Sequence, residues 1–129
     1  MRLLLDTQVF IWLIAGSPRL SRTAADLLAA PENRLYFSHA SIWEMQIKFQ
    51  LGKLPLDADP VTGARHAADQ GFCELLPIAL DHVAGLAELP AVHRDPFDRM
   101  LVSQARAEGL TLVTADADIP RYPVPTLWR

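Results

Sequence analysis

Short, unbroken apolar runs alternate with segments of helical periodicity along the chain, and this alternation limits the possible folds more than any other feature. Strands that are apolar on both faces and separated by helices are typical of a parallel sheet covered on both sides. We therefore predict a three-layer α/β/α sandwich with a mainly parallel sheet of four or five strands. The expected strands are Arg2–Leu5, Leu35–Phe37, Cys73–Leu76, Leu110–Val113 and an edge strand in the tail at 124–128.

Helical periodicity, caps and breakers indicate the segments between the strands. In the third helix the apolar residues suggest a buried stripe, and we expect Trp12 and Trp43 to lie in the core or in an interface. That stripe comprises Ala40, Trp43, Ile47 and Leu51. The expected helices are Thr7–Ala15, a helix capped by Ser21 and ended by Pro31, Ser41–Leu51, Val61–Gln70, Ala79–Leu89 and Phe97–Glu108.

The length of 129 residues fits one domain spanning 1–129. Half of the residues are hydrophobic, which is too apolar for a disordered chain. The lone Cys73 has no partner for an internal disulfide and fits a small core residue in a reducing compartment. The first apolar run ends at Asp6, too early for a signal peptide or a membrane span, so we expect a cytoplasmic protein.

The formal net charge is −3, and the basic residues are scattered along the chain. This distribution lacks the basic patch that is typical of duplex-DNA binding. Two divalent cations held by acidic residues would nevertheless make the formal charge positive. A phosphodiester substrate is therefore compatible with the composition.

Acidic residues follow two of the expected strands or begin two of the expected helices. Asp6 comes directly after the first strand, and Asp116 and Asp118 follow the fourth. Glu44 lies in the first turns of the helix after the second strand, and Asp98 opens the helix before the fourth. Since ligands of open α/β sheets bind beyond the carboxyl ends of the strands, we expect these carboxylates to converge there.

Each acid taken alone also fits a structural role. Glu44 fits the third position of a capping box begun by Ser41, and it can pair with Lys48 four residues on. Asp98 fits the first turn of a helix capped by Asp95. The other acids fit a helix cap or ordinary turns. Only the combination points to chemistry.

Carboxylates about 4 Å apart repel by roughly 4 kcal/mol at an effective dielectric constant near 20. A fold that gathers them needs a compensating cation, and an all-carboxylate site suits Mg²⁺ or Mn²⁺. The four histidines show no metal-ligand spacing and there is no second cysteine, which argues against zinc. His93 fits a surface or loop residue, with the groove as an alternative.

The sequence resembles PIN-domain nucleases of the VapC toxin type. The resemblance runs from end to end, and the motifs are specific as a set although each is weak. It is carried by Leu3–Thr7, Ser38–Glu44, His93–Leu101, Leu112–Asp116 and Val124–Trp128.

The resemblance implies a metal-dependent endoribonuclease. Asp6, Glu44, Asp98 and Asp116 match the four acidic positions of the family, and Asp118 is an optional fifth ligand. The family also implies a homodimer, a cognate antitoxin whose tail covers the active-site groove, and an RNA substrate, often tRNA or another structured RNA.

Further polar residues lie beside these acids. Thr7 and Thr114 fit hydrogen bonds to a ligand carboxylate or a metal-bound water, and equally caps or turns. Arg94 and Arg99 flank Asp98 and fit either phosphate contacts or solvated ion pairs. Many relatives carry histidine where this chain has Gln8, a difference that concerns substrate contacts.

Two other functions compete with the nuclease. A phosphohydrolase of the haloacid-dehalogenase kind needs a second acid two residues after Asp6, where this chain has Gln8. A catalytically silent PIN-fold module that pairs with an antitoxin-like partner would not need all four acids. Metal binding distinguishes the nuclease from the module.

Overall fold

The computed structural model describes residues 1–54, 56–92 and 94–128. The interpretation of His93 as a loop or groove residue lies outside the described residues. Five strands form one sheet in the order β3-β2-β1-β4-β5, and every neighbouring pair is parallel. The strands are β1 (Arg2–Leu5), β2 (Arg34–Ser38), β3 (Glu74–Leu76), β4 (Thr111–Val113) and β5 (Thr126–Leu127).

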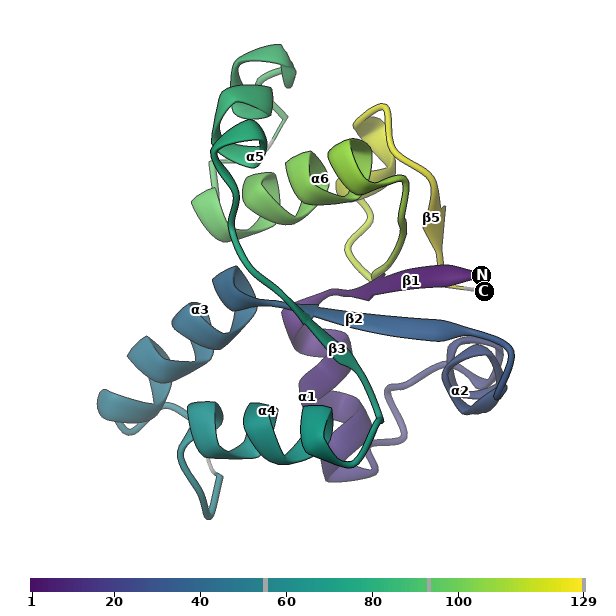
Figure 1. The fold of residues 1–129 in the computed structure, drawn as a ribbon, viewed down its shortest axis with the longest axis vertical. Coiled ribbons are helices and arrows are strands. Elements are labelled where there is room, and N and C mark those ends of the chain that lie inside the picture. Colours follow the sequence, from purple (N-terminus) through teal and green to yellow (C-terminus); the bar gives the residue numbers. More distant parts are fainter. Residues whose placement is uncertain (55, 93, 129) are drawn as a thin grey trace.

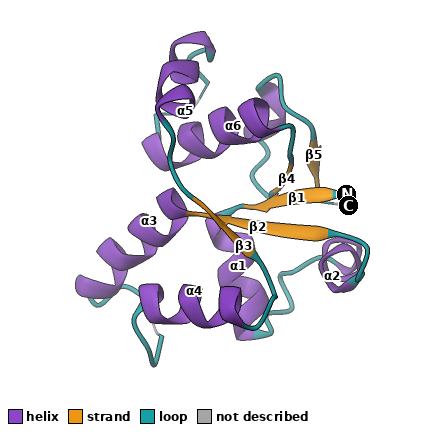
Figure 2. Ribbon diagram, viewed as in Figure 1, coloured by secondary structure: helices purple, strands orange, loops and turns teal. Residues whose placement is uncertain are grey.

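Helices cover both faces of this sheet (Figures 1 and 2). One side carries α1, α2 and α4, and the other carries α5 and α6. The predicted three-layer α/β/α sandwich is therefore confirmed, with all five strands parallel. The helices are α1 (Thr7–Ala15), α2 (Arg22–Ala29), α3 (His39–Gln50), α4 (Pro60–Asp69), α5 (Leu80–Gly85) and α6 (Pro96–Glu108), with 3₁₀ turns η1 (Leu86–Glu88) and η2 (Ile119–Arg121).

The alternation of side chains along β1 divides the interior into two cores. Leu3 and Leu5 are buried on the side of α1, α2 and α4, where the rings of Phe10 and Phe37 stack at 3.9 Å. Leu4 points the other way and belongs to the core formed with α6. The two cores lie on opposite faces of the sheet, and β1 and β4 contribute side chains to both.

The start of α3 differs from the prediction. Ser38 is the N-cap, since its hydroxyl accepts a hydrogen bond from the Ala40 N–H at 3.0 Å. Ser41 therefore lies inside the first turn, and the capping box predicted for Ser41 and Glu44 is wrong. Because the cap is Ser38, at the end of β2, the helix begins at His39. Glu44 therefore lies in its second turn.

The apolar stripe predicted for α3 is also wrong beyond Ala40. Trp43 and Leu51 are exposed to 60% and 62%, whereas Ser41 and Met45 are buried. The prediction counted apolar residues only, and α3 instead turns a small polar residue inward. Trp43 consequently lies outside the core and packs edge-to-face on Phe97, with ring centroids 5.1 Å apart.

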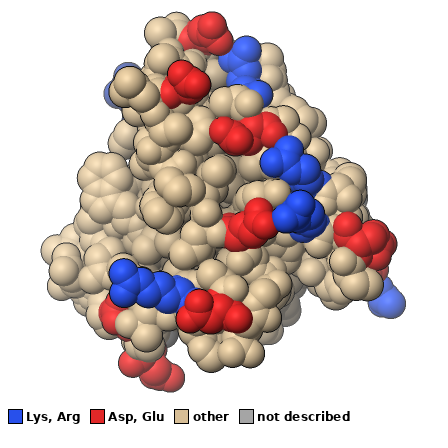
Figure 3. Space-filling model, in the orientation of Figure 1, with Lys and Arg blue, Asp and Glu red and all other residues tan. Residues whose placement is uncertain are grey.

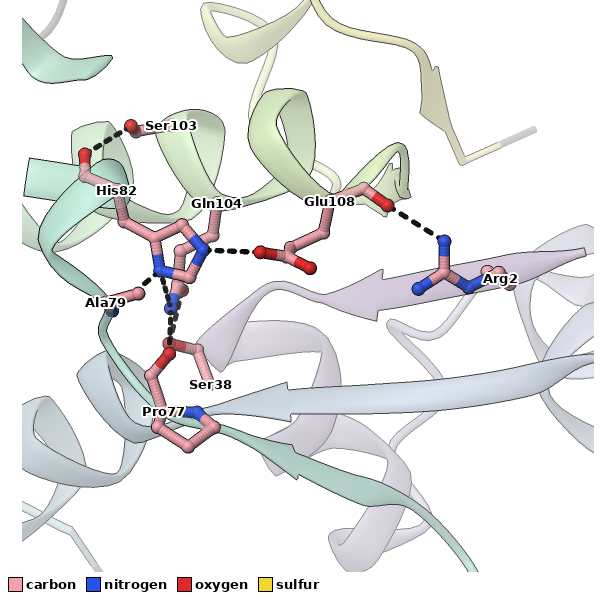
Figure 4. A network of polar contacts seen from close by, with 8 residues as sticks. All are labelled: Arg2, Ser38, Pro77, Ala79, His82, Ser103, Gln104 and Glu108. Atoms are coloured by element: carbon pink, nitrogen blue, oxygen red, sulfur yellow. Dashed lines mark hydrogen bonds and ion pairs between the residues drawn. The ribbon is translucent and has the colours of Figure 1, made fainter. Parts of the chain in front are cut away.

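His82 holds α5 against α6 (Figure 4). Its Nδ1 accepts a hydrogen bond from the Ala79 N–H at 2.9 Å, so Nε2 carries the proton and donates to Glu108 at 2.8 Å. The Ser103 hydroxyl donates to the His82 carbonyl. A Cβ at Gly85 would lie 2.7 Å from the Ser103 Oγ, so a larger residue there would displace the hydroxyl that donates to the His82 carbonyl.

Gln104 lies at the centre of the same network and is fully buried (Figure 4). Its side-chain oxygen accepts a hydrogen bond from Ser38, and its amide donates to the Pro77 carbonyl at 3.3 Å and lies 3.4 Å from the His82 ring. Because Ser38 also caps α3, this glutamine connects α6 to the helix that carries Glu44.

Charged side chains of both signs are interspersed on the face shown in Figure 3. This agrees with the scattered basic residues of the sequence. Within the described residues, none of the helices is both long and apolar enough to cross a bilayer.

Candidate active site

A cleft of about 350 Å³ opens at the carboxyl end of the central strands. The four acids singled out by sequence, Asp6, Glu44, Asp98 and Asp116, all line it. Asp118 instead is an exposed residue directly before η2, and its carboxylate lies 3.5 Å from the guanidinium of Arg121. The other residues that line the cleft are Thr7, Gln8, Ile11, Trp12, Lys48, Asp95 and Ala115.

Asp6 is the most buried of these acids, with 8% of the residue exposed. Its N–H donates to the Val113 carbonyl at 3.0 Å, and its carboxylate accepts a hydrogen bond from Thr114 at 2.7 Å. Burial raises the pKa of Asp6, against the opposing effect of the Thr114 hydrogen bond, and the nearby charges of Glu44 and Asp116 raise it further. This environment therefore disfavours the charged form of Asp6 beside Glu44 and Asp116 unless a cation binds in the cleft.

Glu44 presents an incompletely satisfied carboxylate to the cleft. Its Oε2 accepts a hydrogen bond from the Lys48 ammonium at 3.1 Å. Its Oε1 is buried and has no hydrogen-bond partner among the described residues. A buried acceptor without a partner costs about 1–3 kcal/mol, more for a charged group. This oxygen therefore lacks the partner that a bound cation would supply.

The ends of β4 and α6 supply the other two acids. Asp98 lies in the first turn of α6, where the Asp95 carboxylate caps the helix by accepting from the N–H groups of Phe97 and Asp98. Thr114 donates its hydroxyl hydrogen to Asp6 and accepts from the Asp116 N–H at 3.0 Å. One hydroxyl thus fixes the relative positions of two acids that follow neighbouring strands.

The remaining candidates are placed as follows. Thr7 is buried and donates its hydroxyl hydrogen to Ser41 at 2.8 Å, which ties α1 to α3 below Glu44. Arg94 lines a groove next to the cleft. The guanidinium of Arg99 donates to the carbonyls of Pro90 and Leu86, at 2.9 and 3.3 Å. Arg99 therefore fastens the turn after α5.

The sequence model of the PIN domain matches residues 3–125 of the chain. This chain belongs to the PIN domain family. The resemblance stated from its motifs is thereby confirmed. PIN domains are in general nucleases that use divalent metal ions. Among curated proteins, none is similar enough in sequence to be counted as a relative of this PIN domain.

Solved structures show the same fold. The PIN domain is similar to a chain of VapBC2 from Rickettsia felis bound to a promoter DNA fragment, with 20% identity, a TM-score of 0.71 and 98% of each chain covered. It is similar to a chain of FitAcB from Neisseria gonorrhoeae, with 18% identity, a TM-score of 0.67 and 97% and 96% covered. A chain of a toxin–antitoxin complex from Klebsiella pneumoniae matches with 18% identity, a TM-score of 0.63 and 96% and 94% covered.

The side chains of the cleft fit a hydrated divalent ion. Within the described part of the PIN domain, no three acidic, histidine or cysteine side chains are close enough to enclose an ion directly. Mg²⁺ usually keeps several waters and is held through one or two carboxylates, so two acids of the cleft are enough to hold it. The unpartnered Oε1 of Glu44 and the buried Asp6 are the two features that a cation would satisfy.

Sequence reasoning missed Asp95 and Lys48 as residues of the cleft. Asp95 was interpreted only as a helix cap, a role that the structure shows it has. Lys48 was considered only as a partner of Glu44, and the structure shows that pair together with its place at the cleft. The signal that could have found Lys48 is its spacing, one helical turn after Glu44 on the same face.

The metal-free protein is expected to respond to pH through Asp6. Because the folded-state pKa of Asp6 lies above its ordinary value of 3.8, the folded protein binds more protons than the unfolded chain between the two values. The free energy of unfolding therefore decreases as pH rises through this window. We expect the stability of Asp6→Asn minus that of wild type to increase with pH there and then level off. Urea unfolding in EDTA at several pH values measures the difference, and a difference that stays constant would contradict the assignment.

Proposed function

We propose that this PIN domain is a Mg²⁺- or Mn²⁺-dependent endoribonuclease and the toxin component of a toxin–antitoxin pair. The observation that carries the proposal is the cleft itself, in which the buried Asp6 faces Glu44, Asp98 and Asp116. Membership of a family of nucleases supports the hydrolysis of a nucleic acid. The choice of RNA follows the resemblance to VapC toxins.

A bound divalent ion would supply a polarised water and a neutralising charge for in-line hydrolysis of a phosphodiester. In this proposal Asp6 is the central ligand, held in place by Thr114. Asp98 and Asp116 would help to hold the ion. Glu44 uses its unpartnered Oε1 to orient the attacking water or to hold a second ion.

Neighbouring residues position these acids and the substrate. Thr7, through Ser41, fixes the first turn of α3, which directly precedes the turn that carries Glu44. Arg94 is the better placed of the two candidate phosphate contacts, because the guanidinium of Arg99 already holds the turn at Leu86 and Pro90. Gln8 is exposed at the cleft and suits a substrate contact.

The proposed partners follow from the resemblance and the solved structures. The Klebsiella pneumoniae structure is described as a toxin–antitoxin complex, which supports a cognate antitoxin for this protein as well. We further propose a homodimer that acts in the cytoplasm on a structured RNA such as tRNA. Sedimentation of the purified protein, alone and with the product of a neighbouring antitoxin gene, tests both assemblies.

The nuclease is tested with purified, antitoxin-free protein and total RNA. Wild type with Mg²⁺ or Mn²⁺ is expected to make discrete cuts that EDTA abolishes and that excess metal restores. Asp98→Asn should make none at equal protein concentration, and mapping of the cut ends then identifies the target. Equal RNA profiles for both proteins across several RNA pools, with both shown to be folded by circular dichroism, would favour the binding module.

A further inference from the structure

The pair formed by Glu44 and Lys48 is unequal in its exposure. The two residues are one helical turn apart on α3, and the Oε2–Nζ distance is 3.1 Å. The glutamate side chain is 12% exposed, whereas the lysine side chain is 46% exposed. The carboxylate is therefore fixed at the cleft, while the ammonium group can return to solvent at little cost in hydration.

Lys48 neutralises the carboxylate of Glu44 only in part. It binds one carboxylate oxygen of Glu44, and the other oxygen remains buried without a hydrogen-bond partner among the described residues. The negative charge of Glu44 also opposes ionisation of the neighbouring Asp6. A doubly charged ion attracts both carboxylates more strongly than one ammonium group that contacts a single oxygen.

A second groove, of about 450 Å³, adjoins the cleft and shares Glu44, Lys48 and Asp95 with it. Arg94 and Phe97 also line this groove, and Arg94 is exposed. Lys48 thus lies at the boundary between the acidic cleft and the adjoining groove, which is lined by a second positively charged side chain, that of Arg94. Two neighbouring cations beside a hydrolytic site suit the phosphates of a nucleic-acid strand.

We propose that Lys48 is an exchangeable counter-ion for Glu44. In the metal-free protein its ammonium group neutralises Oε2, and it leaves that oxygen when a divalent ion binds. The released Lys48 then turns into the adjoining groove and, with Arg94, contacts a phosphate of the RNA strand next to the one being cut. This inference rests on the proposed metal-dependent nuclease and adds a substrate contact that forms only in the metal-loaded protein.

The exchange is tested first by titrating Mn²⁺ into the protein without RNA, in a calorimeter. Removing the competing ammonium in Lys48→Met should tighten Mn²⁺ binding about fivefold, which corresponds to ~1 kcal/mol. Lys48→Arg keeps a cation and should stay within about twofold of wild type. Arg94→Met removes a nearby charge that is not paired with Glu44 and should also change the affinity by less than about twofold.

The phosphate contact is tested by the salt dependence of KM for RNA cleavage with saturating Mn²⁺. Each of Lys48→Met and Arg94→Met should raise KM and lower the slope of log KM against log salt by about 0.7–0.9. Equal Mn²⁺ affinities for wild type and Lys48→Met, or equal tightening in Arg94→Met, would overturn the exchange. An unchanged salt slope in Lys48→Met would overturn the RNA contact. If Lys48→Met does not fold, Lys48→Gln takes its place.

These outcomes separate the inference from the proposed function. Failure of the wild type to cut RNA, while it binds Mn²⁺ and Lys48→Met binds Mn²⁺ more tightly, would refute the nuclease and leave the exchange standing. Metal-dependent cleavage by the wild type with equal Mn²⁺ affinities would do the reverse.

Discussion

Asp6→Asn is expected to reduce RNA cleavage by about 100-fold or more and at the same time to stabilise the metal-free protein. Loss of the central ligand removes several kcal/mol of charge stabilisation from the reaction, and 100-fold corresponds to about 2.7 kcal/mol. The stability of the metal-free protein increases because the substitution removes a buried carboxyl group, whose pKa is raised by burial and by the charge of Glu44. The amide oxygen can still accept the hydrogen bond from Thr114.

Two measurements check this prediction together. Cleavage rates are compared with those of Asp26→Asn, the same chemical change at an exposed residue of α2, which should stay close to wild type. Thermal unfolding is followed with and without Mn²⁺. The ion should raise the unfolding temperature of wild type and of Asp26→Asn but leave that of Asp6→Asn nearly unchanged. An Asp6→Asn protein that still cuts RNA at more than a tenth of the wild-type rate would remove Asp6 from its proposed role.

Gln104→Leu is expected to lower the free energy of unfolding by about 3 kcal/mol, because buried polar groups lose their partner. The Ser38 hydroxyl loses the oxygen to which it donates, and the Pro77 carbonyl loses a donor. Leucine is not smaller than glutamine, so the loss does not come from a cavity.

Urea unfolding at neutral pH in EDTA measures this loss. Gln50→Leu is the matched control, since Gln50 is the exposed last residue of α3 and its substitution should change stability by less than about 0.5 kcal/mol. A loss below about 1 kcal/mol in Gln104→Leu would mean that water or other groups replace its hydrogen bonds. The network of Figure 4 would then not be what holds α6 to the start of α3.

The sheet and the convergence of the four acids could be predicted from sequence because both depend on local patterns. The apolar runs at Arg2–Leu5 and Thr111–Val113 identify buried parallel strands without reference to their neighbours. Once those strands are placed in one parallel sheet, Asp6 and Asp116 must lie at the same edge, and the structure places both in the cleft.

The orientation of α3 could not be predicted in this way. Ser38 and Ser41 are both good caps, and the choice between them depends on where β2 ends. The face that turns inward includes Ser41, which accepts a hydrogen bond from Thr7, 34 positions earlier in the chain. Such a contact leaves no periodic signal, and for this reason the sequence pattern places Trp43 on the buried stripe of the helix although it is exposed.

The order of the strands has a consequence for biosynthesis. β4 pairs with β1, so that Leu4 lies beside Leu112, and Asp116 comes only after β4. Until β4 leaves the ribosome, the growing chain has one central strand with an unpaired edge and lacks a carboxylate of the cleft. The cleft can therefore form only after the segment that follows β4 has been made, later in translation than β1, β2 and β3.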